Sequence, residues 1–323
     1  MAWFVVRRFA GAAVLGVLAA SLAYLLAASA LNPRAAFEGR VPRPPQAVID
    51  ARLTELNLDD RTPLPERYGR WATGVLHGDF GRTVDGDPVG AELGRRILVT
   101  LRLMALGTLL GCGLGVAAGY LGAVKQYGPA DRTITVGSFA VLATPVFVLA
   151  VLLQLGAGQI NRLTGVRFFE WVGEYPPGDP GLLGRLQHLL LPTLTIALGQ
   201  VAVYGRYQRA LMLDVLRADY VRTAMARGLP RRTALRRHAL RTAVIPMTGF
   251  FAYHAGLMLL GATFTEKIFG WHGMGEWLID AIGRGDVNVV AAYDVFAAVL
   301  VLLAGLLATV AQAVLDPRVR RAR

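Results

Sequence analysis

The sequence predicts an all-α integral membrane protein with six transmembrane helices. Apolar residues make up 54% of the 323 residues and charged residues only 17%, whereas soluble domains usually carry about 25% charged residues. Several apolar stretches reach the roughly 20 residues that a helix needs to cross a bilayer. The net charge of +12 comes from arginines that gather between these stretches.

Each expected span is bounded by charged residues, proline or glycine. In chain order the six spans are Trp3–Leu31, Leu98–Leu121, Ile134–Ala157, Leu186–Tyr204, Ile245–Phe264 and Val289–Leu315. Arg7 and Arg8 precede an apolar run that ends in Ala-Ala-Ser-Ala, a pattern also typical of a cleavable signal peptide. The run from Phe9 to Leu31 is longer than the roughly 7–15 apolar residues of such a signal, so a retained helix is favoured.

The positive charges predict the orientation of the spans. The segment 205–241 holds ten arginines and two aspartates, and arginines also gather in the tail 316–323 and at the N-terminus. Because loops rich in Arg and Lys stay in the cytoplasm, both termini are expected to be cytoplasmic. The sequence is thus divided into a first helix (1–31), an external segment (32–97) and a five-helix core (98–315) followed by the tail.

The external segment has ten arginines and ten acidic residues and contains two expected helices. Residues Gln46–Leu56 follow two prolines and form the first, since proline suits the start of a helix. Tyr68, Trp71, Ala72 and Val75 lie at helical spacing and give the second an apolar face. Two interpretations stay open: a helix lying on the membrane interface or on neighbouring spans, and a ledge for an external partner.

The spans carry few groups that suggest chemistry. His254 lies inside the fifth span and Asp294 near the start of the sixth, and a hydrogen-bonded packing role is favoured for His254 because no second buried acid or base is evident. The single cysteine, Cys112, is expected to be a small buried packing residue.

Nucleotide-binding and catalytic motifs are also missing from the sequence. Gly111, Gly115 and Gly119 lie inside an expected span, where small residues let another helix approach closely, so they are not a nucleotide loop. We found no phosphate loop, metalloprotease helix or nucleophile elbow. The chain is therefore expected to be no enzyme and to bind no cofactor or metal, and uphill transport would need energy from another chain.

A basic segment, Asp219–Pro246, separates the fourth and fifth spans. Tyr220–Arg227 is an expected helix that ends at Gly228, where glycine accepts a positive φ and Leu229 can fold back as a cap contact. Pro230 suits the start of a second helix that runs into the fifth span. A DNA-binding helix–turn–helix is disfavoured because its second helix would run into the bilayer and could not enter a DNA groove. A lipid anchor and a dock for a soluble motor both stay open.

The segment resembles the cytoplasmic EAA loop of permease subunits of binding-protein-dependent ABC importers. Arg222–Ala224 stand where the loop has Glu-Ala-Ala, Gly228 stands at its glycine, and Ala243–Pro246 (AVIP) stand at its closing Ile-x-Leu-Pro. The missing Glu and the longer gap resemble the oligopeptide/dipeptide branch. Three further stretches resemble the family and occur in the family's order along the chain: Gly78–Gly81 with Pro88-Val89 and Thr100–Leu103, Ala143–Val148, and Glu266–Trp277. The proline that the family usually has before the position of Thr100 is absent. The long external segment best suits the first permease of the pair, the OppB/DppB type.

The resemblance implies a place in a larger assembly in the bacterial plasma (inner) membrane. In such importers two different six-helix permeases enclose the pathway, two cytoplasmic ABC ATPases bind beneath them and hydrolyse ATP, and an external binding protein delivers substrate. No nucleic acid is involved. The residues implied to couple to an ATPase are Tyr220, Arg222, Thr223, Ala224, Arg227, Gly228, Leu229, Arg231 and Pro246.

The last outer loop contains candidate residues for an outer gate. These are Glu266, Trp271, Met274 and Trp277, although aromatic residues there are more often interface anchors. The family's substrates are mostly peptides, and some relatives carry nickel or other small solutes. Two other hypotheses stay open: a self-sufficient channel or gradient-driven carrier that uses His254 and Asp294, and a receptor or scaffold that uses the external segment.

Overall fold

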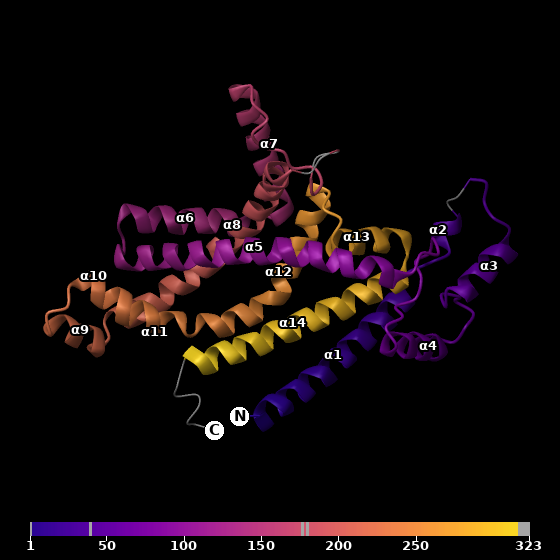
Figure 1. Cartoon of the computed structure of the whole chain (residues 1–323), viewed down its shortest axis with the longest axis horizontal. Coiled ribbons are helices and arrows are strands. Elements are labelled where there is room, and N and C mark those ends of the chain that lie inside the picture. The colour runs from indigo at the N-terminus through magenta and orange to yellow at the C-terminus, as the bar shows by residue number, and fades with distance from the viewer. Residues whose placement is uncertain (1, 39–40, 176–177, 179–180, 316–323) are drawn as a thin grey trace. The chain divides into compact units, whose positions relative to one another are not determined.

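The computed structural model describes residues 2–38, 41–175, 178 and 181–315 (Figure 1). Within these ranges the regular structure is helical, apart from an isolated bridge between Arg82 and Pro88. The helices are α1 (Ala2–Ala30), α2 (Ala35–Glu38), α3 (Gln46–Glu55), α4 (Leu64–Leu76), α5 (Val89–Val124), α6 (Pro129–Ala143), α7 (Val146–Thr164), α8 (Leu182–Leu216), α9 (Asp219–Ala226), α10 (Arg231–Ala234), the π-helix η1 (Leu235–Leu240), α11 (Arg241–Val244), α12 (Met247–Phe269), α13 (Met274–Arg284) and α14 (Val287–Leu315).

The chain divides into two compact units. Unit 1 holds Met1–Leu101 and Trp271–Leu303, and unit 2 holds Arg102–Gly270 and Ala304–Arg323. The expected cytoplasmic tail 316–323 lies outside the described residues.

The helices confirm the all-α membrane fold. Five stretches of the described residues are long and apolar enough to cross a bilayer: Ala13–Ala30, Val89–Val124, Val146–Thr164, Leu182–Leu216 and Val287–Gln312. Helix α12 occupies the expected fifth span with 23 residues, but it is not among these five. The count of six spans therefore stays a prediction.

The third expected span is not one unbroken helix. Helix α6 ends at Ala143 and α7 begins at Val146, and Figure 1 shows the chain changing direction between them. Pro145 explains the break, because the residue before a proline is driven out of the helical region and Thr144 is extended (φ −93°, ψ 121°). The expected span Ile134–Ala157 is therefore divided between two helices, and the apolar stretch long enough to cross a bilayer lies over Val146–Thr164 instead.

In unit 1, the apolar face predicted for α4 packs on the first helix. The ring of Trp71 stacks on the ring of Tyr24 of α1 with centroids 4.5 Å apart, and the hydroxyls of Tyr68 and Ser21 are 2.7 Å apart. Trp71 is buried, and Tyr68, Ala72 and Val75 pack against the same apolar cluster. Both helices predicted for residues 32–97, the segment expected to be external, are confirmed, and α4 rests on the candidate span α1.

Polar groups at the start of α14 fasten the external segment within unit 1. The carboxylate of Asp286 accepts hydrogen bonds from the backbone N–H of Val84 (2.8 Å) and of Val289 (3.2 Å). The amide of Asn288 donates to the carbonyls of Arg82 (2.8 Å) and Leu56 (3.3 Å). Burial raises the pKa of Asp286, and bonds from the two N–H groups oppose this rise. The external segment is therefore a folded part of unit 1.

Arg34 joins several carboxylates of the external segment. Its guanidinium lies 2.5 Å from a carboxylate oxygen of Asp50 and 2.6 Å from one of Asp60. Arg61 pairs with the second oxygen of Asp50 at 2.8 Å. Hydrogen bonds from Arg34 hold the pKa of Asp50 and of Asp60 below its usual value of 3.8.

Acidification should loosen the part of this segment around α3. Because the pKa of each carboxyl is lowered in the folded state, its charged form stabilises the fold above pH 3.8, and this stabilisation is lost as the pH falls through the lowered folded values. We expect the hydrogen-exchange protection of residues 46–62, corrected for intrinsic rates, to fall below about pH 4. In Arg34→Gln, protection should be lower at neutral pH and should change little with acid. An equally steep loss in the variant would contradict this account.

In unit 2, the glycines at four-residue spacing form a close seam between α5 and α8. A Cβ atom on Gly111 would lie 2.8 Å from the carbonyl oxygen of Ala197, and one on Gly119 would lie 2.5 Å from that of Gly205. The predicted packing role of these glycines is confirmed. Cys112, on the same helix, is half-buried rather than fully buried as expected.

An ion pair that the sequence analysis missed fastens α6 to α8. Asp131 is 3% exposed and accepts hydrogen bonds from Nε (2.6 Å) and Nη2 (2.8 Å) of Arg209. It also accepts one from the backbone N–H of Tyr127 at 2.8 Å, and these bonds hold the pKa of Asp131 below its usual value. The pair closes the turn between α5 and α6 and ties both to α8.

Asp131→Asn should weaken unit 2 without removing the shape of the side chain. Removal of one charge from a buried ion pair costs about 3–5 kcal/mol, and we expect the lower end because the side chain of Arg209 is 26% exposed. Thermal unfolding can be followed through maleimide labelling of Cys112, the only cysteine. Asp214→Asn, at an exposed position of α8, is the matched control. Equal unfolding temperatures for the two variants would contradict a structural role for the pair.

Candidate functional site

Helix α9 ends in the turn that the sequence predicted. The N–H of Gly228 donates to the carbonyl of Met225 at 3.0 Å, and the N–H of Leu229 donates to that of Ala224 at 3.2 Å. These two bonds, with a φ of +91° at Gly228, form a Schellman motif, in which a left-handed residue closes the helix. A positive φ is easy for glycine and strained for other residues, which accounts for a glycine at this position.

The buried side of α9 joins it to the ends of the long helices of unit 2. Val221 is fully buried in an apolar cluster that also contains Ala123 of α5, Met212 of α8 and Leu235 of η1. Ala224, the other buried residue of the helix, is 8% exposed. A displacement of α9 would therefore act directly on α5 and α8, because close-packed interiors transmit strain.

The opposite side of α9 is exposed and chemically mixed. Tyr220, Arg222 and Thr223 are exposed on the helix, and Arg227 and Gly228 are exposed on the turn that follows. Only two residues, Arg217 and Ala218, separate α9 from the long helix α8. The helix is thus a short handle with a free outer face and a short connection to a candidate span.

Not every residue predicted for coupling lies on this handle. Leu229 is half-buried in the turn, and Arg231 is exposed at the start of α10. Pro246 lies away from α9 in sequence and precedes the first residue of α12. The second helix after the turn contains a π-helix, Leu235–Leu240, which the sequence did not signal. The structure thus gathers Tyr220–Arg231 at one turn, whereas Pro246 belongs to the entry into the next long helix.

The candidate outer-gate residues are buried rather than free. Glu266 of unit 2 is 0% exposed, and in unit 1 Trp271 and Met274 are 1% and 0% exposed. Trp277 is half-buried, with the guanidinium of Arg96 4.7 Å from its ring centroid. These positions suit packing of the outer loop, and a gating role stays a prediction.

Two residues of α5 that the sequence analysis missed hold the loop of unit 1 before α13. The hydroxyl of Thr100 accepts a hydrogen bond from the backbone N–H of Met274 at 2.8 Å. Arg96 pairs with Glu276 at 3.1 Å and donates to the carbonyl of Gly273 at 3.3 Å. Thr100 lies in the stretch Thr100–Leu103 that resembles the family, whereas Arg96 carried no sequence signal beyond its charge.

The residues of the carrier hypothesis are placed in packed helices. His254 lies against aromatic rings, with its centroid 4.2 Å from that of Phe250 and 6.2 Å from that of Tyr204. Asp294 is half-buried in α14 of unit 1. Within the described ranges, no group of three or more His, Cys, Asp or Glu side chains is placed to hold a metal ion.

Comparison with known proteins decides the class of the protein. Residues 111–321 match the family described as binding-protein-dependent transport system inner membrane component. The chain belongs to this family. The permease is 50% identical over 325 aligned residues to the oligopeptide transport system permease protein OppB of Mycobacterium tuberculosis, with 99% of each chain covered. It is 32% identical to the oligopeptide transport system permease protein AppB of Bacillus subtilis (86% and 87% covered) and 33% identical to the dipeptide transport system permease protein DppB of Escherichia coli (83% and 84% covered).

Membership gives the permease its class and its compartment. It is a multi-pass protein of the inner membrane and a non-catalytic transmembrane component of an ABC transporter, which works with partner subunits. The resemblance to the OppB/DppB type is confirmed over nearly the whole chain. The coupling residues and the outer-gate residues stay predictions.

Proposed function

We propose that the permease is the first transmembrane subunit of an ATP-driven importer of oligopeptides or dipeptides. The observation that carries this proposal is the 50% identity to OppB of M. tuberculosis over 99% of both chains. The relatives from B. subtilis and E. coli also bear the names of oligopeptide and dipeptide transport proteins. An importer of nickel or another small solute is the alternative within the family, and no relative reported above favours it.

The permease forms half of the pathway together with a second six-helix permease. It crosses the membrane six times, with both termini and α9 in the cytoplasm, where two ATPases bind. An external binding protein delivers the peptide. The arginine-rich segment 205–241 supports this orientation.

Helix α9 and the Gly228 turn are the handle on which one ATPase acts. Their free outer face and the burial of Val221 among α5, α8 and η1 support this role. ATP binding closes the ATPase pair and displaces α9, and the apolar cluster passes that displacement to the spans. The hydrolytic residues belong to the ATPases.

Affinity capture of the tagged permease from its native cells in mild detergent tests the assembly. We expect mass spectrometry to identify a second permease and ATPase chains. Uptake of radiolabelled oligopeptides should fall to background in a strain that lacks the gene and return with the wild-type copy. Capture of the permease alone, together with solute transport by the purified chain in liposomes without ATP, would instead support the self-sufficient carrier.

A further inference from the structure

The arginines after the Gly228 turn form a second exposed surface, distinct from α9. Arg232 on α10, Arg236 and Arg237 on η1 and Arg241 on α11 are all exposed, and we call them the basic face. No acidic residue occurs between Asp219 and Glu266. Among the described residues, none of the four forms an ion pair, whereas Arg222 of α9 lies 3.8 Å from Asp219. The basic face thus offers four charges that no acidic side chain in the described part of the chain neutralises.

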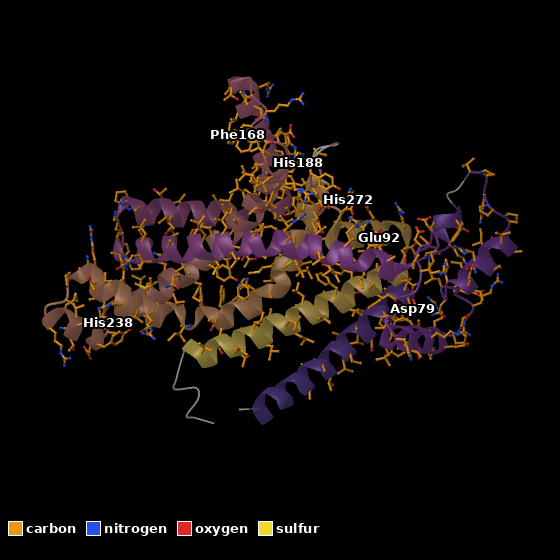
Figure 2. All side chains as sticks on the ribbon, in the orientation of Figure 1. Asp79, Glu92, Phe168, His188, His238 and His272 are labelled. Atoms are coloured by element: carbon orange, nitrogen blue, oxygen red, sulfur yellow. The ribbon has the colours of Figure 1, made fainter. Side chains whose placement is uncertain are left out.

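The other side of the same segment is apolar and packed. Leu235, Ala239 and Ala243 are at most 3% exposed and lie in the cluster with Met212 of α8 and Val221 of α9. The segment contacts α8 and α9 through η1. The basic face therefore points away from the apolar cluster. Figure 2 labels His238 of this segment at the end of unit 2 that α9 and α10 form.

The π-helix reduces the angle around the helix axis over which the four arginines of the basic face are spread. Each turn of η1 takes more residues than the 3.6 of an α-helix, because its hydrogen bonds join residues five apart. Residues four apart, such as Arg232 and Arg236 or Arg237 and Arg241, therefore come closer to one line than in an α-helix. Since π-turns are rare and recur at functional sites, this geometry favours a specific ligand over a merely solvated face.

The segment also leads directly into α12, the helix that the proposed topology makes the fifth span. Arg241 lies six residues before the start of α12, which is at most about 9 Å at a helical rise of 1.5 Å per residue. A long arginine side chain can extend its guanidinium toward the headgroup layer from such a position. In contrast, Arg222 lies on α9 and Arg227 lies directly after it, so both come before the Gly228 turn and farther along the chain from α12.

We propose that the basic face binds the phosphate of an anionic phospholipid of the cytoplasmic leaflet, with Arg237 and Arg241 as its main contacts. The planar guanidinium groups match a phosphate through paired hydrogen bonds, and the inner leaflet attracts basic segments beside a span. The bound lipid holds the start of α12 in place. A displacement of α9 therefore moves α8 while α12 stays fixed. This inference rests on the proposed cytoplasmic position of the segment.

Two double variants, which remove the same number of charges, separate the lipid from the ATPase. Arg237→Gln/Arg241→Gln alters the basic face, and Arg222→Gln/Arg227→Gln alters the α9 handle. Each tagged complex is purified and transferred to nanodiscs of phosphatidylcholine with or without phosphatidylglycerol, and retained lipid is measured by native mass spectrometry. Elution volume and Cys112 labelling confirm that each variant is folded.

We expect the basic-face variant to retain about ten- to thirtyfold less phosphatidylglycerol than the wild type, while its ATPase chains stay bound. The α9 variant should retain the lipid and lose the ATPase chains. Equal lipid retention in both variants would overturn the proposal, as would loss of the ATPase chains from the basic-face variant with its lipid intact. If the α9 variant kept its ATPase chains, that result would contradict the coupling role of α9. It would not bear on the lipid proposal, because lipid retention is measured separately.

Discussion

Gly228→Arg should abolish peptide uptake while the permease still inserts into the membrane. The φ of +91° at Gly228 strains most other residues, arginine included, and a strain of about 1–3 kcal/mol corresponds to about 5–150-fold in a coupled equilibrium. A Cβ atom here would meet nothing within 4 Å, so the loss comes from the turn and from the new bulk on the outer face. Radiolabelled peptide uptake and the amount of permease in the membrane fraction are the two readouts.

Two further substitutions at Gly228 separate strain from bulk. Asparagine tolerates the left-handed region better than most residues, so Gly228→Asn should keep most of the uptake. Gly228→Ala adds strain with little bulk and should fall between the two. Normal uptake by Gly228→Arg at normal membrane levels would contradict the coupling role of this turn.

Gly119→Leu should prevent stable folding of unit 2. A Cβ atom on Gly119 would lie 2.5 Å from the carbonyl oxygen of Gly205 and 2.8 Å from the backbone nitrogen of Arg209. Backbone atoms of a helix cannot move aside as a flexible side chain can, and overpacking in a core costs about 1–3 kcal/mol or more. We expect a lower unfolding temperature, measured through Cys112 labelling, and a lower yield of permease.

Gly113→Leu is the matched control for the seam. Gly113 lies on the same helix, is exposed, and has open space around a Cβ atom, so leucine should be tolerated. If both variants unfolded at the same temperature, the α5–α8 seam would not be the reason for the glycine spacing.

Local patterns in the sequence predicted the parts of the site that depend on local rules. Gly228 could be placed because a helix often ends at a left-handed residue, and the chain offers glycine there after a run of helix formers. The apolar face of α4 followed from helical spacing around Trp71. The packing role of Gly111–Gly119 followed from small residues at a four-residue repeat.

Features that depend on tertiary contacts were not predictable in this way. Asp131 and Arg209 are 78 positions apart in the sequence. Taken alone, each residue has the pattern of an ordinary charged residue in a loop or on the cytoplasmic side, so the sequence does not indicate that the two form a pair. The break at Pro145 was missed because apolar length alone cannot tell a tolerated proline from one that ends a helix. The π-helix Leu235–Leu240 has no compositional signal, because its residues suit an α-helix equally well.

Site-specific photocrosslinking from α9 tests the central claim most directly. A photoreactive amino acid is placed at Thr223, which is exposed on α9, and in a control at Thr73, which is exposed on α4 of the external segment. We predict that the Thr223 probe crosslinks, in intact cells, to a protein that carries a nucleotide-binding phosphate loop, and that the Thr73 probe does not. A Thr223 probe that never captures such a protein, in cells whose peptide uptake is intact, would contradict the role of α9 as the handle of an ATPase.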